Sequence, residues 1–166
     1  LHHIMKVKRH YFNGVAFRLK INSKSMKDSL LSLAITEQDK ALTLEIQAPY
    51  ILNELAVLYS NLNKNDKAES YLLKAIELIP DWAVPRANLS SIYQFTNRYK
   101  EGIESAKKAL ELKPNYTAAL VNLGLCYYKI GNYLYAEENL RKAIENGNNY
   151  FLTYEYLGNC YFQKLN

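Results

Sequence analysis

Residues 53–80 read NELAVLYSNLNKNDKAESYLLKAIELIP, and the pattern returns at residues 87–114 as ANLSSIYQFTNRYKEGIESAKKALELKP and at residues 121–148 as VNLGLCYYKIGNYLYAEENLRKAIENGN. Each copy starts 34 residues after the previous one. Self-similarity at this period is typical of repeat proteins, in which each copy buries its apolar face only against its neighbours. We therefore expect a stack of similar units.

Within each copy, two groups of positions carry the pattern. The first group is a leucine, a small residue and a tyrosine, and it occurs as Leu55, Ala56, Tyr59; Leu89, Ser90, Tyr93; Leu123, Gly124, Tyr127; and Leu157, Gly158, Tyr161. The second group occurs as Ala68, Leu72, Ala75, Pro80; Gly102, Ala106, Ala109, Pro114; and Ala136, Leu140, Ala143, Asn148.

These spacings predict two amphipathic helices per copy, because apolar residues recur at helical intervals in both groups. The small residues, Gly158 included, are expected where two helix backbones approach closely. Polar or glycine-containing turns separate the helices at Asn63–Asp66, Thr96–Arg98 and Gly131–Asn132. Pro80 and Pro114 follow the second helices, where proline ends a helix.

The residues at these two groups of positions, which we call the repeat marks, resemble those of the tetratricopeptide repeat. The resemblance covers Pro49 to Tyr150 as three full repeats, at residues 49–82, 83–116 and 117–150. Residues 151–166 would form a partial repeat or a capping helix, with Tyr154, Leu157 and Tyr161 packed on the third repeat. The resemblance implies an all-α fold, a right-handed superhelical solenoid of antiparallel helix pairs with a concave groove.

Residues 1–48 are expected to form a basic N-terminal segment with a degenerate helical hairpin. A helix is predicted from about Lys24 to Gln47, because Ala34 and Ala41 keep the 34-residue spacing with the next repeat. Gly14 and Phe17 fit the first-helix marks only if the following turn is longer than in the other copies. The alternative is an irregular basic arm or the tail of a preceding domain.

Composition limits the class of protein. The chain has 166 residues, 49% of them hydrophobic and 22% charged, with a formal charge of +5, which is ordinary for a folded globular protein. Between Met5 and Lys27 there are seven lysine and arginine residues and no aspartate or glutamate. Two cysteines are too few for a disulfide framework, and no apolar run is long enough to cross a bilayer. We expect no membrane association and a cytoplasmic protein by default.

The resemblance implies that the first helices build the inner wall of the groove. Among the residues that the resemblance places on this inner wall are Glu54, Ala87, Val121 and Phe162. The residues expected to contact a partner are Tyr50, Asn53, Val57, Asn88, Ser91, Phe95, Asn122, Leu125, Tyr128 and Asn159. Asn88 and Asn122 occupy equivalent positions, and an amide can both donate to and accept from an extended peptide backbone. The alternative is that asparagine is only tolerated on an exposed helix face.

The pattern favours a protein-interaction scaffold that holds a peptide segment or a helix of another protein. An enzyme is not expected, because all three histidines precede residue 11 and the repeats show no phosphate-binding loop, metal-ligand cluster or cofactor motif.

Self-association through the terminal helices is the second hypothesis. Nucleic-acid binding through the basic segment is a third and weaker one, because most tyrosines fall on packing positions. An acidic chaperone tail is disfavoured because the resemblance places Asn53, Val57, Ala118 and Leu152 where a groove for such tails has Lys or Asn.

Overall fold

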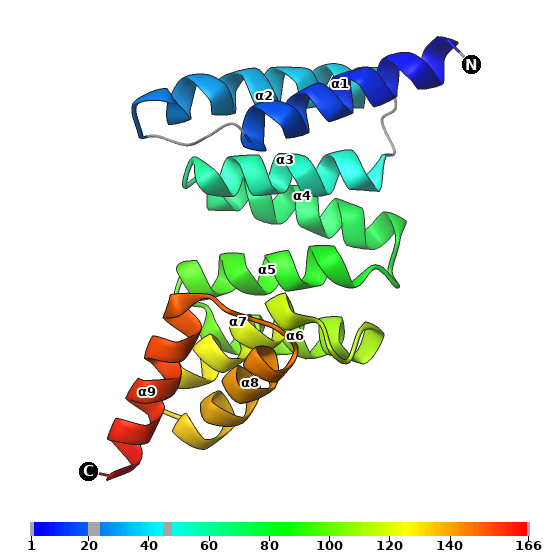
Figure 1. The fold of residues 1–166 in the computed structure, drawn as a ribbon. Helices are drawn as coiled ribbons and strands as arrows, with labels where there is room; N and C mark the ends of the chain where they lie inside the picture. The colour runs from blue at the N-terminus through cyan, green and yellow to red at the C-terminus, as the bar shows by residue number, and fades with distance from the viewer. Residues whose placement is uncertain (1, 20–23, 45–47, 166) are drawn as a thin grey trace. The chain divides into compact units, whose positions relative to one another are not determined.

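The computed structural model describes residues 2–19, 24–44 and 48–165, and these residues form nine helices and no strand (Figure 1). The helices are α1 (His2–Leu19), α2 (Lys24–Leu44), α3 (Pro49–Asn61), α4 (Asn65–Leu78), α5 (Ala83–Phe95), α6 (Tyr99–Leu112), α7 (Thr117–Lys129), α8 (Tyr133–Glu145) and α9 (Phe151–Leu165). The predicted all-α class is confirmed. The predicted helix from about Lys24 is described as far as Leu44, and its expected end at Gln47 lies outside the described residues.

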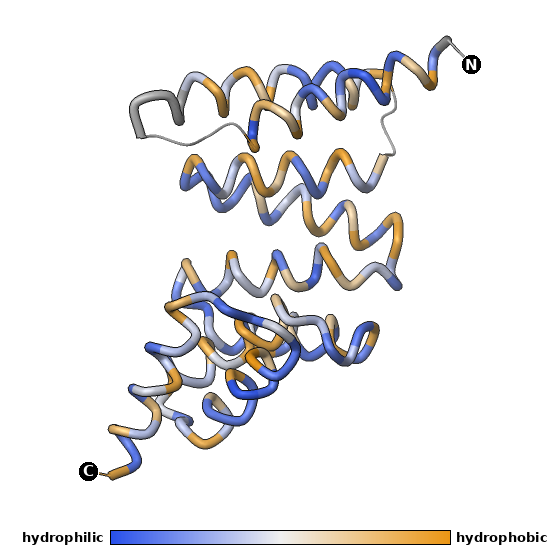
Figure 2. The backbone as a smooth tube through the Cα atoms, viewed as in Figure 1, coloured by the Kyte–Doolittle hydropathy of each residue, from blue (hydrophilic) through white to orange (hydrophobic). Residues whose placement is uncertain are grey.

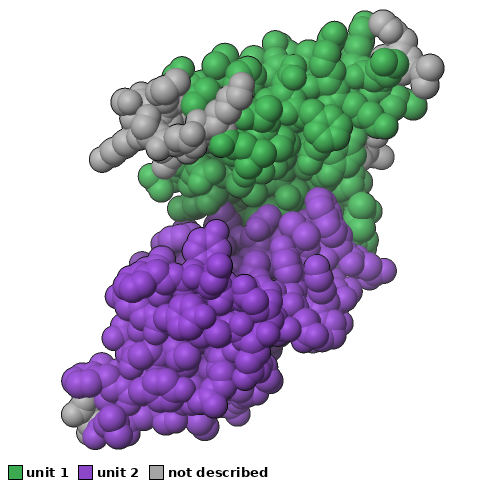
Figure 3. Space-filling model, viewed as in Figure 1, with its two compact units in different colours: residues 1–80 green, residues 81–166 purple. Residues whose placement is uncertain are grey.

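The chain divides into two compact units (Figure 3). Residues 1–80 contain α1 to α4, and residues 81–166 contain α5 to α9. The expected domain boundary between residues 48 and 49 stays a prediction. The structure groups the N-terminal helix pair with the first full repeat, because α3 packs against both α2 and α1.

Within each unit, consecutive helices pair as antiparallel hairpins, and the hairpins pack on one another. The pairs are α1 with α2, α3 with α4, α5 with α6, and α7 with α8. In the second unit α7 also packs against α5 and α6, and α9 packs against α8 and α7. Polar and apolar residues alternate along the helices (Figure 2), so each helix has an apolar side for its neighbours and a polar side for solvent.

The turns within the three full repeats share one backbone conformation. Asn63, Asn97 and Gly131 all have positive φ angles, of 58°, 61° and 79°. The amide that follows each of them donates to a tyrosine carbonyl at the end of the preceding helix; Asn132 N to Tyr127 O, for example, measures 2.9 Å. This is a Schellman ending, which needs a left-handed residue and therefore favours Gly or Asn. The repeating Asn or Gly in the turns has this physical cause.

The small residues of the first helices lie where the paired helices touch. A Cβ atom on Gly124 would lie 2.7 Å from Cγ of Leu140 on α8, so only glycine fits without movement. Ser90 is fully buried, and its hydroxyl donates to the carbonyl of Gly102 at 2.7 Å. The expectation for Gly158 is wrong. A Cβ there would meet nothing within 4 Å, because none of the described helices covers that face of α9.

Gly124 and Gly158 therefore form a matched pair for testing the steric account. Gly124→Ala should lower the free energy of unfolding by about 1–2 kcal/mol, because overpacking against Leu140 exceeds the gain in helix propensity. Gly158→Ala should raise it by about 0.5–1 kcal/mol, because the added methyl group meets open space. Urea denaturation followed by circular dichroism measures both. Equal effects of the two substitutions would contradict the account.

The N-terminal helix pair is held by apolar packing and by a close backbone approach. Val7 of α1 is buried with Ala41, Ile51 and Leu55 in one core cluster. Gly14 lies against α2, where a Cβ atom would come within 2.5 Å of Nε2 of Gln38. That side chain is fully buried, and its Nε2 donates to the carbonyl of Tyr11 at 3.0 Å. Gly14 thus allows α1 to approach α2 as closely as Gly124 allows α7 to approach α8.

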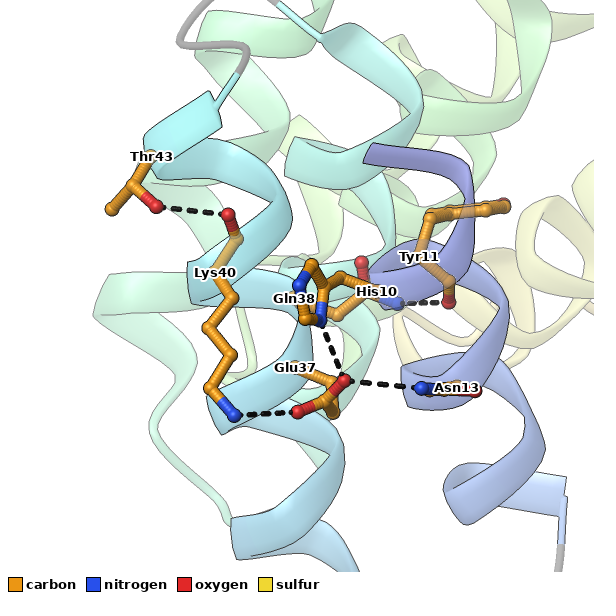
Figure 4. Close-up of polar contacts among 7 residues, drawn as sticks. All are labelled: His10, Tyr11, Asn13, Glu37, Gln38, Lys40 and Thr43. Carbon is orange, nitrogen blue, oxygen red and sulfur yellow. Dashed lines mark hydrogen bonds and ion pairs between the residues drawn. The ribbon is translucent and has the colours of Figure 1, made fainter. Parts of the chain in front are cut away.

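A mostly buried carboxylate, Glu37, also ties α1 to α2 (Figure 4). Its oxygens accept from Nζ of Lys40 at 2.7 Å and from Nδ2 of Asn13 at 3.3 Å, and Nδ1 of His10 lies 2.8 Å away. The hydrogen bonds from Lys40 and then His10 lower the pKa of Glu37 from 4.5 to about 2. The ionised form of Glu37 therefore stabilises the first unit.

This lowered pKa predicts an acid-dependent contribution to stability. Because the folded pKa lies below the unfolded value, the contribution is present above about pH 4.5 and is lost as pH falls toward about 2. Glu37→Gln should lower the free energy of unfolding at pH 7 by on the order of 2 kcal/mol, and the difference from the wild type should shrink through that window. Denaturant titrations at several pH values measure it.

Glu77→Gln, which changes an exposed carboxylate on α4 of the same unit, is the control. A pH-independent difference between Glu37→Gln and the wild type would show that Glu37 does not act through its charge.

Candidate functional site

The first helices of the second unit present one face that the second helices cover only in part, since Leu125 and Tyr128 of α7 pack against a core cluster of α8 and α9. This face carries predicted contact residues from three helices, all half-buried or exposed: Asn88, Ser91 and Phe95 on α5; Asn122, Leu125 and Tyr128 on α7; and Asn159 on α9. Residues three, four and seven apart share a face of a helix. We call these seven residues the second-unit wall.

In the first unit, Tyr50, Asn53 and Val57 lie on α3 and are likewise half-buried or exposed. The ring of Tyr11 on α1 meets the ring of Tyr50 edge to face, with centroids 5.0 Å apart. Sequence reasoning did not select Tyr11. Aligning Gly14 with Gly124 would have found it, because Tyr11 then falls on the repeat position of Val121, a predicted wall residue.

Two residues expected on the wall are buried instead. Glu54 is 6% exposed, because Arg18 of α1 covers it and forms a bidentate ion pair with its carboxylate. Ala87 is fully buried in a cluster with Ala109 and Ala119. Neither side chain is available to a partner in this structure.

The amide of Asn122 has a role within the fold. Its Nδ2 donates to the carbonyl of Ala87 at 2.8 Å, which joins α7 to α5. Because an amide nitrogen has two hydrogens, this bond leaves Asn122 with further hydrogen-bonding capacity. Asn122 is therefore a structural residue of the wall, and its predicted contact with a partner stays a prediction.

A cavity opens between α7 and α9. It has a volume of about 180 Å³ and is lined by Val121 and Leu125 from α7, Leu152 and Thr153 from α9, and Asn148 and Tyr150 from the connection. Asn148 Oδ1 accepts from the Tyr150 amide at 3.2 Å, and the Thr153 amide donates to the Tyr150 carbonyl at 3.0 Å. These two hydrogen bonds fix the segment between α8 and α9, which forms one side of the cavity.

Helix α9 is anchored partly as expected: Leu157 packs against a core cluster of α8, together with Tyr156, which was not expected there. Thr153 and Cys160 are the buried residues of α9, and Cys160 packs with Ala136 and Leu140 of α8. Tyr154 is 49% exposed and Tyr161 is 41% exposed. Both tyrosines are therefore only partly covered by the described residues, in contrast to the close packing expected for them.

Polar contacts at the C-terminal end supplement this anchoring. Arg141 of α8 donates to the Tyr161 hydroxyl at 2.8 Å, and Lys164 pairs with Glu137 at 2.7 Å. The hydrogen bond from Lys164 lowers the pKa of Glu137, so this carboxylate stays ionised at neutral pH. Both contacts are exposed, so they add little to the packing of α9 on α8.

Neither cysteine is arranged as a nucleophile. Cys126 and Cys160 are both buried. Burial raises the pKa of Cys126 to about 11, although a hydrogen bond with Ser90 opposes the shift, and burial also raises the pKa of Cys160. Both are therefore thiols at neutral pH, whereas reactivity requires a thiolate.

The described residues also contain no group of three or more His, Cys, Asp or Glu side chains placed to hold a metal ion. Within the same residues, no helix is both long and apolar enough to pass through a bilayer. Of the seven basic residues near the N-terminus, Lys6, Lys8 and Arg9 are exposed on α1, while Arg18 is paired with Glu54. The side chains of Lys20, Lys24 and Lys27 lie outside the described part.

Hairpins of antiparallel helices, with the same turn conformation in the three full repeats and small residues at a fixed interval where the helices nest, define a helical-repeat protein. A family model for the tetratricopeptide repeat matches residues 49–81, 86–116 and 117–146, more than half of the chain. The chain therefore belongs to the tetratricopeptide repeat family, as the sequence marks predicted. Proteins of this family are in general protein-interaction scaffolds.

Solved structures with the same fold include a MamA protein, with 22% identity, a TM-score of 0.75, and coverage of 96% of this chain and 82% of that one. The first TPR domain of Spaghetti (RPAP3), bound to the HSP90 peptide SRMEEVD, has 20% identity, a TM-score of 0.69, and coverage of 72% and 95%. YrrB, described as a TPR protein with an unusual peptide-binding site, has 21% identity, a TM-score of 0.70, and coverage of 90% and 73%. No curated protein sequence matches the chain.

The bond between α7 and α5 can be tested by Asn122→Ala. We expect this substitution to lower the free energy of unfolding by about 1–2 kcal/mol, because it removes a hydrogen bond and leaves the carbonyl of a buried residue without that partner. Asn159→Ala, at an exposed wall position, should change stability by less than about 0.5 kcal/mol. Thermal denaturation measures both, and no loss on Asn122→Ala would refute the structural role.

Proposed function

We propose that the second-unit wall binds an extended peptide segment of another protein. The observation that carries this proposal is the chemical character of the wall: amide, hydroxyl, aromatic and aliphatic side chains with no charged member. Amide and hydroxyl groups can pair with the unpaired backbone of an extended chain, and aromatic groups supply contact area.

The related structures support a peptide as ligand. One of them holds an HSP90 peptide, and another is described by its peptide-binding site. Their identity to this chain is low, so they support the class of ligand and do not identify a sequence. The HSP90 peptide carries two consecutive glutamates and an aspartate, whereas the wall of this chain has no cation to match them. We infer a partner segment that is uncharged where it meets the wall.

Catalysis is not part of the proposal. The buried cysteines are protonated, and His10 lies beside Glu37 in the packing between α1 and α2. A binding module needs neither a nucleophile nor a base, and the wall offers neither.

Panning an immobilised sample of the full chain against a random peptide library tests the proposal. Enriched peptides should bind in fluorescence anisotropy, and Phe95→Ala should weaken them at least about fivefold, because exposed aromatic side chains are common binding hot spots. Phe95 is 67% exposed, so its removal should leave the fold intact. Leu134→Ala is the matched control, since Leu134 is 64% exposed but lies on α8, outside the wall.

Failure to enrich any peptide, or equal weakening by both substitutions, would contradict the proposal. Self-association through α9 is the second candidate, favoured by the exposed apolar side chains of Phe151, Leu152, Phe162 and Leu165 on that helix. A stable dimer in sedimentation velocity, with no peptide enriched, would favour it.

A further inference from the structure

The cavity between α7 and α9 has the chemistry of a subsite for an apolar group. None of its six lining residues (Val121, Leu125, Asn148, Tyr150, Leu152 and Thr153) carries a charge. The polar side chain of Asn148 is turned to the Tyr150 amide, with which it forms a hydrogen bond of 3.2 Å. An occupant would therefore meet mainly carbon atoms.

The size of the cavity sets the size of the occupant. Its volume is about 180 Å³. A buried apolar cavity of about 150 Å³ in another protein holds one benzene molecule, so a phenyl ring or a branched aliphatic group fits here. A methyl group would leave most of the space empty.

The cavity is also accessible from the wall. Val121 and Leu125 are one turn apart on α7 and half-buried, and Leu125 belongs to the second-unit wall. Tyr150 is 73% exposed and Leu152 is 59% exposed at the rim. A side chain that projects from a peptide on the wall can thus enter the cavity while its backbone stays outside.

We propose that this cavity receives one large apolar side chain, of the phenylalanine or leucine class, from an extended partner peptide. This inference rests on the proposed function and specifies its ligand. A carboxylate or ammonium group in the cavity would lose its hydration without gaining a partner among the lining residues, so charged side chains are excluded from this position. The apolar anchor fixes the register of the peptide on the wall.

The first experiment tests the cavity without any peptide. The full chain, labelled with ¹³C at its methyl groups, is titrated with N-acetyl-phenylalanine amide, N-acetyl-leucine amide and N-acetyl-glutamate amide. The first two should shift the methyl resonances of Val121, Leu125 and Leu152, and the third should not. Val121→Phe, which fills the cavity, should abolish the shifts of the remaining two residues. A response to the glutamate probe equal to that of the phenylalanine probe would overturn the inference.

The second experiment uses the peptides enriched on the full chain. They should share one Phe, Leu or Met, its replacement by alanine should weaken binding at least tenfold, and Val121→Phe should weaken it to a similar extent. Leu152→Ala, at an exposed rim position that is not needed for folding, should also weaken binding. Val15→Phe is the matched control, because it makes the same change at a half-buried position of α1 in the first unit, outside the predicted contact residues.

The two experiments separate the inference from the proposed function. Peptides that lack a common apolar residue and bind Val121→Phe normally would overturn the inference while the wall remains a peptide site. Methyl shifts with no enriched peptide would support the apolar preference of the cavity and overturn the peptide-binding function.

Discussion

The close approach of paired helices is the constraint on which the rest of the structure depends. Where α7 meets α8, a Cβ on Gly124 would collide with Leu140, and where α1 meets α2, a Cβ on Gly14 would collide with Gln38. Small residues at these points let each hairpin close, and the closed hairpins then bury their apolar sides on their neighbours. Because each second helix is used for this packing, part of one face of the first helices stays accessible, and in the second unit that face carries the wall residues.

The same constraint determines what the sequence could predict. The three full repeats were predictable because their marks have local causes: a left-handed turn residue at Asn63, Asn97 and Gly131, and a small residue at each helix crossing. The N-terminal pair was harder because α1 matches only two marks. The prediction for Gly158 was wrong because a small residue at this repeat position is needed only where a second helix crosses the first. Among the described residues, no helix packs against that face of α9.

Side-chain contacts between first helices could not be predicted, because they join residues about one repeat apart with no pattern of their own. The Arg18 pair that buries Glu54 and the bond from Asn122 to Ala87 are both of this kind. The cavity likewise depends on residues distant in sequence, since its lining comes from α7, α9 and the segment that joins α8 to α9. The candidate residues were therefore placed on the correct helices, while the division between structural and accessible residues required coordinates.

The most direct measurement of the central claim is a crystal structure of the full chain with a bound peptide from the library. The account predicts an extended peptide along the first helices of the second unit, with an apolar side chain enclosed by Val121, Leu125 and Leu152. A peptide bound on the outer side of α6 or α8, or one that leaves this cavity empty, would contradict it.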